Sequence, residues 1–324
     1  HWLSTATAIN IKNYLRMQAS VLGTFVQDRS TSNNAAREFL NNTEQPAKQA
    51  LDTKLAPAIF LSYRPTQLVD VRLNAFYKQS YRYPTFNDLY YTDMGNAYLK
   101  PELAKQHSVG LSFTQPFRIA QQRGSEFRIN ADYYYNRISD KIIAYPKGQQ
   151  FRWTMLNLGL VKINGLDINA QLHFVLPENF YLTAKAQYTY QTAVDVTDPS
   201  DTYYGHQIPY IPWHSGSAVG ILGWQNDWMQ YGLNYSFIYV GERYNQQENI
   251  LFNYTQPWYT HDLSVYGEWD IYKVKGESLE VKGKRLFTLR VALDVNNLLS
   301  QDYDVILNYP MPKRNYKCTI SITY

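Results

Sequence analysis

The feature that most constrains this chain is an alternation of apolar and polar residues that persists over about ten residues at a time. In the segment 69–78 apolar residues occupy every second position from Val69 to Tyr77, and the segments 126–136, 181–190 and 286–296 repeat the pattern. An extended strand directs successive side chains to opposite faces of its sheet, so each segment predicts a strand with one apolar and one polar face. Strands in soluble sheets usually have roughly five or six residues, whereas about ten tilted residues cross the apolar core of a bilayer.

No stretch approaches the roughly eighteen consecutive apolar residues of a membrane-spanning helix, so a helical membrane protein is excluded. Strands cross a bilayer only as a closed sheet, because lipid satisfies no backbone hydrogen bonds. Aromatic residues make up 16% of the chain, as expected where rings form girdles at two membrane boundaries. The sequence therefore predicts an all-β transmembrane antiparallel β-barrel. The alternative is a large soluble β-protein, in which a solvated face would also produce alternation.

The alternating segments and their connections predict about twelve strands. They are expected near residues 12–29, 56–64, 68–80, 105–115, 126–145, 152–175, 180–193, 211–223, 228–244, 258–272, 286–299 and 313–324. Short turns at 64–67, 176–179 and 224–227 alternate with long loops at 30–55, 81–104, 194–210, 245–257 and 300–312. This is typical of an outer-membrane barrel, whose long loops lie outside the cell. The connections 116–125 and 273–285 are longer than this pattern predicts.

The last strand alternates up to a terminal aromatic residue, Tyr324, as the last strands of outer-membrane barrels do. Cys318 falls on its apolar face and is interpreted as a small apolar filler. The formal net charge is +4 and the charges are scattered singly, so a nucleic-acid partner is not expected.

The segment 80–105 contains, in this order, an Arg-x-Pro, a Leu-Tyr, a Gly-Asn and a Leu-x-Pro-Glu string. The nine positions are Arg82, Pro84, Leu89, Tyr90, Gly95, Asn96, Leu99, Pro101 and Glu102. Together they resemble a motif of TonB-dependent outer-membrane receptors. The chain is expected to leave a strand at Pro84, to turn at Gly95-Asn96 with positive φ, and to re-enter the sheet after Pro101. A structural role is the preferred interpretation for most of the nine.

A second string is similar to the usual ending of the same family. Its members are Asn297, Leu298, Tyr303, Tyr309, Pro310, Pro312 and Arg314. Lys313 stands where the family commonly has glycine, so the turn before the last strand departs from the family pattern.

The resemblance implies a barrel of about 22 strands with a plugged lumen. Residues 1–324 are then the C-terminal half of the barrel, and the N-terminal plug domain and the first strands are absent. The resemblance also implies uptake of a scarce nutrient, such as cobalamin, a ferric siderophore or haem, by TonB-coupled active transport. Expected partners are outer-membrane lipid, the TonB complex acting through the plug, the protein's own N-terminal half, a surface lipoprotein and the small-molecule nutrient.

Aromatic residues in the long loops are the candidates for nutrient contact, because rigid rings give contact area at low entropic cost. They are Tyr83, Phe86, Tyr90, Tyr91, Tyr203, Tyr204, His206, Tyr244, Phe252, Tyr254 and Trp258. The alternative for each is a place in a girdle or in the packing of a loop. Asp195, Asp198 and Asp201 could ligate Ca²⁺, although a solvated acidic loop is the preferred interpretation.

Neither catalysis nor a cofactor is predicted. The chain has no Gly-x-Ser-x-Gly string, no phosphate-binding glycine loop and no His-Glu-x-x-His string. The competing hypothesis is a complete twelve-stranded barrel that acts as a passive channel or an outer-membrane enzyme.

Overall fold

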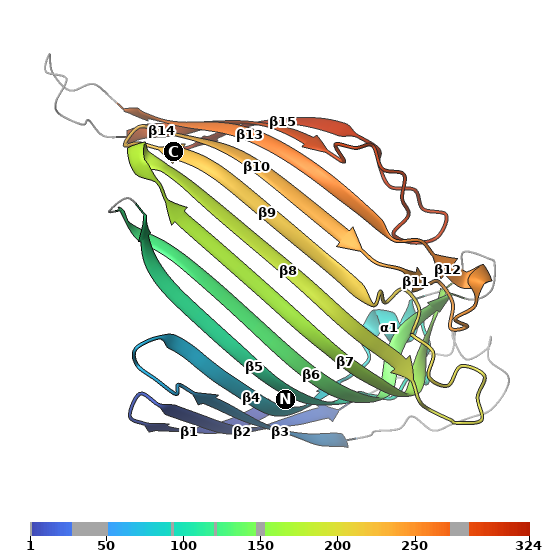
Figure 1. Ribbon diagram of the computed structural model, residues 1–324. Coiled ribbons are helices and arrows are strands. Elements are labelled where there is room, and N and C mark those ends of the chain that lie inside the picture. Colours follow the sequence, from blue (N-terminus) through green and yellow to red (C-terminus); the bar gives the residue numbers. More distant parts are fainter. Residues whose placement is uncertain (1, 28–50, 92–93, 120–121, 147–152, 273–284) are drawn as a thin grey trace, which may run out of the picture.

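The computed structural model describes residues 2–27, 51–91, 94–119, 122–146, 153–272 and 285–324 (Figure 1). Thirteen antiparallel strands form one sheet in chain order. They are β1 Trp2–Ile11, β2 Leu15–Gln27, β3 Leu51–Tyr63, β4 Asp70–Arg82, β5 Glu102–Ile119, β6 Gln122–Pro146, β7 Trp153–Val175, β8 Phe180–Asp195, β9 His214–Gln225, β10 Met229–Val240, β13 Trp258–Tyr272, β14 Arg285–Asn296 and β15 Asn315–Thr323. Two short strands, β11 Arg243–Tyr244 and β12 Tyr254–Thr255, pair with each other in a loop.

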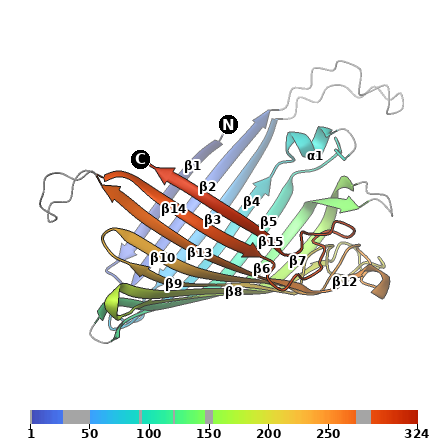
Figure 2. The ribbon, with the colours of Figure 1, turned by 90° about the horizontal axis from the view of Figure 1, so that it is seen from above.

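The sheet is bent into an open trough, with β1 at one edge and β15 at the other (Figures 1 and 2). The helical segments of the described residues are the five-residue helix α1 Phe86–Tyr90 and two 3₁₀ turns, Pro177–Asn179 and Leu251–Asn253. None of these helical segments is long or apolar enough to span a bilayer.

The strand count exceeds the expected twelve because β1 was missed. Its apolar-side positions include Thr5 and Thr7, which lie opposite Val21 and Ala19 of β2, and the threonines weaken the alternation. The expected long connection 116–125 was also wrong, because β5 continues to Ile119 and β6 begins at Gln122. The connection 273–285 lies almost wholly outside the described residues.

The register aligns residues of one kind on each face of the sheet. Across β4 to β8, one apolar row passes through Leu73, Leu111, Ala131, Ile168 and Tyr188. The adjacent row on the opposite face is polar and passes through Arg72, Ser112, Asn130, Asn169 and Gln187. The predicted alternation therefore gives these strands one apolar and one polar face.

Tyrosine rings cover glycines on the polar face. The rings of Tyr181 on β8 and Tyr266 on β13 lie over Gly223 and Gly232, and their hydroxyl oxygens are 3.5 Å apart. Gln230 Nε2 donates to these two hydroxyl oxygens at 2.8 and 3.0 Å. Strands β9 and β10 separate the two tyrosines, and such convergence is expected on the concave face of a curved sheet. The polar face is therefore the inside of the trough.

Candidate ligand-binding loops

The long connections 83–101, 196–213, 241–257 and 297–314 all leave the same end of the sheet, at the right of Figure 1. The connections 12–14, 64–69, 176–179 and 226–228 lie at the opposite end and are short. In the described part of the chain, long connections thus lie at one end of the sheet and short ones at the other, as the sequence predicted. The loop end is where an external ligand would be received.

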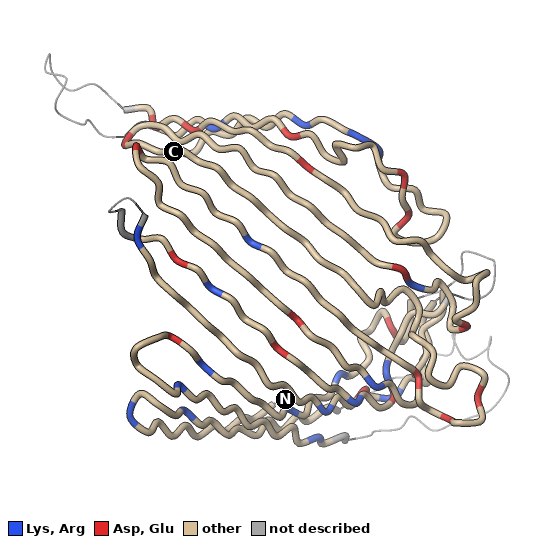
Figure 3. The backbone as a smooth tube through the Cα atoms, in the orientation of Figure 1, with Lys and Arg blue, Asp and Glu red and all other residues tan. Residues whose placement is uncertain are grey.

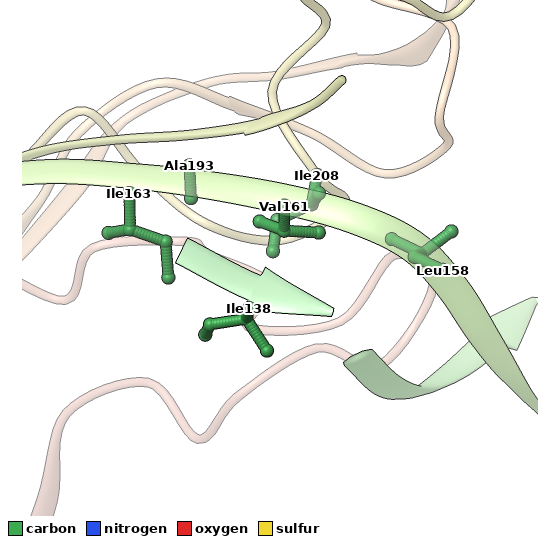
Figure 4. Close-up of a cluster of buried hydrophobic side chains, with 6 residues drawn as sticks. All are labelled: Ile138, Leu158, Val161, Ile163, Ala193 and Ile208. Carbon is green, nitrogen blue, oxygen red and sulfur yellow. The ribbon is translucent and has the colours of Figure 1, made fainter. Parts of the chain in front are cut away.

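Near the loops, the inner face of the trough changes from polar to apolar. Ile138 on β6 lies opposite Val161 on β7, and Ile163 on β7 lies opposite Ala193 on β8. Ile208 from the loop 196–213 packs against them (Figure 4). Val161 and Ala193 are completely buried. This cluster holds the loop 196–213 against the sheet.

Gln207 fastens the same loop through its side chain and its main chain. Its Oε1 accepts a hydrogen bond from Ala193 N–H at 2.8 Å, and its Nε2 donates to the Ile211 carbonyl at 3.2 Å. Its main-chain N–H and carbonyl both bond to the Asn249 amide, at 2.6 and 3.0 Å. Because Asn249 belongs to the loop 241–257, this amide joins the two loops.

Arg243 joins the loop 241–257 to the loop 297–314. Its guanidinium donates to the carbonyls of Gln256, Asp304 and Val305 at 3.3, 2.8 and 3.3 Å. The side chain is buried, and this burial lowers the pKa of Arg243. A guanidinium has five N–H donors in a rigid plane, which suits it to gather carbonyls from two segments.

A cavity of about 330 Å³ opens between these loops. Its lining residues are Ala144, Trp153, Pro209, Tyr210, Val240, Arg243, Trp258, Val305 and Ile306. The rings of Trp153 and Tyr210 are 5.8 Å apart, and Trp258 stacks on Tyr303 at 4.5 Å. Within the described structure, the buried indole N–H of Trp258 has no acceptor. The cavity is therefore lined by aromatic faces together with the polar side chains of Tyr210 and Arg243.

The candidates in the loop 83–101 lie on and beside α1. Phe86, Tyr90 and Tyr91 are 76%, 50% and 59% exposed, whereas Tyr83 is half-buried. A capping box formed by Thr85 and Asp88 begins the helix. Its exposed rings are free of the sheet and accessible to a ligand.

The remaining aromatic candidates divide into exposed and packed residues. Tyr204 and Phe252 are 44% and 80% exposed. Tyr203, His206, Tyr244, Tyr254 and Trp258 are partly buried. Tyr244 packs edge-on against Tyr254 and Trp213, and His206 Nδ1 lies 3.3 Å from both the Gln247 carbonyl and the Asn249 nitrogen. These packed residues shape the loops, and Trp258 alone of them lines the cavity.

The three loop aspartates each bond to neighbouring groups. Asp195 is buried and accepts from Thr197 and from Gln247 Nε2, and Asp198 and Asp201 accept from main-chain N–H groups two residues ahead. The hydrogen bonds from Ser200 lower the pKa of Asp198. Over the described ranges, no three His, Cys, Asp or Glu side chains come together to hold a metal ion.

The first motif fastens the loop 83–101 to the sheet. Arg82 forms ion pairs with Asp88 and Glu102 at 3.4 and 3.6 Å, and Glu102 accepts from Ile142 N–H. Gly95 was expected to have positive φ, and this was wrong. Glycine is needed for another reason: a Cβ there would lie 2.6 Å from Tyr91 N.

The second motif forms the turn into β15. Asn297 is buried, has a φ of 51°, and bonds to Gln301 and to the Pro312 carbonyl. Arg314 Nε donates to the Leu298 carbonyl at 2.8 Å. Lys313 forms an ion pair with Asp302 at 3.0 Å, and its φ is not positive, so the turn does not need glycine there.

A bent antiparallel sheet with an apolar outer face, a polar inner face and joined loops at one end defines a wall of a bacterial outer-membrane β-barrel. The family model described as TonB dependent receptor-like, beta-barrel matches residues 13–298. The chain therefore belongs to the TonB-dependent receptor family, whose members are transporters of the outer membrane and not enzymes.

Relatives and solved structures agree with this assignment. The chain is 38% identical over 90 residues to "Vitamin B12 transporter BtuB" of Vibrio vulnificus, covering 28% of this chain and 13% of the relative. It is 25% identical over 273 residues to the protein of the same name from Photobacterium profundum, covering 81% of this chain and 37% of the relative. The ferric preacinetobactin receptor BauA from Acinetobacter baumannii shares the fold, with a TM-score of 0.64 at 14% identity over 100% of this chain and 42% of BauA. The chain thus spans well under half of these proteins.

The sequence did not single out the cavity residues Trp153, Tyr210, Arg243 and Ile306. Trp153 and Tyr210 are aromatic residues in or beside connections, so a wider search of the loop ends would have found them. Arg243 has no such signal, because its carbonyl partners lie up to 62 residues away.

Proposed function

We propose that this chain forms part of the wall and of the external loops of a receptor that takes up a scarce nutrient by TonB-coupled active transport. The observation that carries the proposal is the family barrel over residues 13–298, whose loops are fastened to one another by Arg243 and Gln207. Such fixed loops present exposed rings in defined positions, which lowers the entropic cost of binding. Phe86 and Phe252 are the most exposed of the candidate rings.

Cobalamin is the proposed nutrient. Two relatives are named vitamin B12 transporters, and a cavity lined by aromatic rings, with Tyr210 and Arg243 as polar groups, suits one substituent of a large organic ligand. A ferric siderophore or haem is the second candidate, because exposed aromatic loops also suit these flat or aromatic ligands.

We further propose that the whole receptor includes an N-terminal plug and the remaining strands of the wall. The nutrient binds between the loops and the plug, and the TonB complex acts on the plug from the periplasm. A surface lipoprotein is a further proposed partner.

The test is binding and uptake of labelled cyanocobalamin by cells that produce the full-length receptor. We expect saturable binding, and uptake that is lost when TonB is deleted while binding persists. The variant Phe252→Ala should weaken binding about tenfold if this ring contacts the ligand. Binding of a ferric siderophore or haem without binding of cobalamin would reassign the nutrient, and uptake independent of TonB would contradict active transport.

A further inference from the structure

Three cationic side chains stand side by side on the outer face of the sheet, near its loop end. Lys105 on β5 lies directly opposite Arg137 on β6, and Arg137 lies directly opposite Lys162 on β7. Val109 and Tyr133, 62% and 55% exposed, lie on the same strands an even number of residues away, so the row belongs to the apolar face. Lys and Arg residues gather at the loop ends of these strands (Figure 3).

The row has no acidic neighbour on its face. The row toward the middle of the strands consists of His107, Tyr135 and Asn164, and the row toward the loops consists of Leu103, Ser139 and Leu160. The flanking residues Gln79 and Val194 are uncharged too. Among the residues that the structure describes, no carboxylate lies within ion-pair distance of the three cations. Glu102, which is close in sequence, is buried and pairs with Arg82.

Like charges directly opposite each other on neighbouring strands destabilise a sheet. Two successive pairs of this kind are unfavourable unless an anion lies between them. The row lies just beyond a band of rings, in which Tyr77 packs on His107 at 4.9 Å and His107 on Tyr135 at 6.2 Å. Aromatic bands mark the boundary between the apolar core and the headgroups, so the cations lie at headgroup level on the side of the external loops.

We propose that Lys105, Arg137 and Lys162 bind the phosphate groups of a lipid headgroup in the outer leaflet of the outer membrane. Strands are about 4.8 Å apart, so the row spans roughly 10 Å, a distance that one or two headgroup phosphates bridge. Arg137 in the centre offers a planar pair of donors to phosphate oxygens, and each lysine adds a mobile charge. The acyl chains of this lipid would cover the apolar face below the row. This lipid site is independent of the nutrient that the receptor carries.

The test uses the full-length receptor in detergent, titrated with bisphosphorylated lipid A and followed by native mass spectrometry. In the variant Lys105→Gln/Arg137→Gln/Lys162→Gln we expect binding to weaken by roughly a hundredfold, about fivefold for each cation removed. Lipid A stripped of its phosphates should bind the wild-type receptor and this variant equally weakly. The charge-conserving variant Lys105→Arg/Arg137→Lys/Lys162→Arg should keep wild-type binding.

The matched control removes the same charge from the inner face with Lys78→Gln/Lys185→Gln/Lys317→Gln, and it should leave lipid binding within about twofold of the wild type. Heat-modifiable electrophoretic mobility verifies that each variant is folded, and the three single substitutions replace the triple variant if it is not. Unchanged lipid A binding in the variants that replace these three cations with glutamine overturns the proposal. An equal loss in the inner-face control, or equal binding of phosphate-free lipid A by the wild type, also overturns it.

Discussion

Arg243 shows how one residue holds a loop end together. Its guanidinium bonds to carbonyls of two loops, and its side chain is buried. A glutamine has only two N–H donors on a shorter side chain, so at least one of the three carbonyls would lose its donor, and an unsatisfied buried polar group costs more than the hydrogen bond contributes. The geometry of the cavity beside it depends on the same contacts.

We therefore expect Arg243→Gln to lower the local opening free energy of the loops 241–257 and 297–314 by about 3 kcal/mol. Hydrogen–deuterium exchange of the full-length receptor measures this opening loop by loop. Arg128→Gln is the control, because Arg128 lies on the inner face near the short-turn end of the sheet, far from these loops, and its 45% exposed side chain pairs with Glu126, a type of contact worth at most about 1 kcal/mol when exposed. Equal protection of both loops in the two variants would show that Arg243 does not hold them.

At the scale of strands, the inner face repeatedly packs a tyrosine ring of one strand over a glycine of the neighbouring strand. Tyr134 on β6 covers Gly165 on β7, and its hydroxyl donates to Gln191 Oε1 on β8 at 3.1 Å. Three strands are thereby joined by one side chain. A Cβ at Gly165 would lie 2.2 Å from the tyrosine ring, so this ring lies flat only because the neighbour is glycine.

Gly165→Ala should therefore destabilise the barrel by about 1–3 kcal/mol, because the ring must lift and release Gln191. Urea unfolding of the full-length receptor in lipid vesicles measures the change. Gly220→Ala is the matched control, because nothing lies within 4 Å of a Cβ at that position, and it should change stability by less than about 0.5 kcal/mol. A loss at both positions alike would point to strand propensity and not to the ring.

The two faces of a strand also differ in what they tolerate. Leu293 on β14 lies opposite Val265 and Cys318 on the apolar face, halfway along β13. Leu293→Arg should cost about 2–4 kcal/mol near the middle of the bilayer. Thr288→Arg should be mild, because Thr288 faces the inside and bonds to the Asp270 carboxylate at 2.6 Å. The same vesicle unfolding assay compares them, and equal costs would contradict the assignment of faces.

For the whole molecule, the two ends of the sheet predict its orientation in the membrane. Thr202→Cys, in the exposed loop 196–213, should react with a membrane-impermeant thiol reagent on intact cells. Asp227→Cys, in a short turn, should react only after lysis. Asn226 is less suitable because its side chain caps the turn through Trp228 and Met229. The native Cys318 lies on the apolar face. Both cysteine variants are therefore made together with Cys318→Ser, so that only the introduced cysteine of this segment can react. Labelling of Asp227→Cys on intact cells would reverse the orientation.

The open edges of the trough predict what this segment does alone. Over the described residues β1 and β15 each pair on one side only, and unpaired strand edges are not tolerated in lipid. Residues 1–324 expressed alone should not give a discrete, protease-resistant, ion-conducting barrel. Co-expression with an N-terminal fragment carrying the plug and the first strands should restore a heat-modifiable complex. A closed barrel from this segment alone would favour the twelve-stranded alternative.

The sequence by itself determined the class of fold, the faces of the strands and the family. Alternation is a local property, since each residue's face follows from its neighbours two positions away, so Val71 and Leu73 could be assigned without tertiary contacts. It failed at β1, where Thr5 and Thr7 occupy apolar-side positions. It also failed at 116–125, where Pro116 interrupts the pattern of one strand and the residues 122–125 that begin the next strand include no apolar side chain.

Only the tertiary structure decided which loop residues lie together. Arg243, Gln207 and Trp153 are distant in sequence from the groups that they contact, and nothing local marks those contacts. The same holds for the outer row of Lys105, Arg137 and Lys162, because register sets which residues of three strands are neighbours. Register depends on pairing between strands and on turn geometry, and so the site, unlike the fold class, could not be predicted from the order of residues along a single strand.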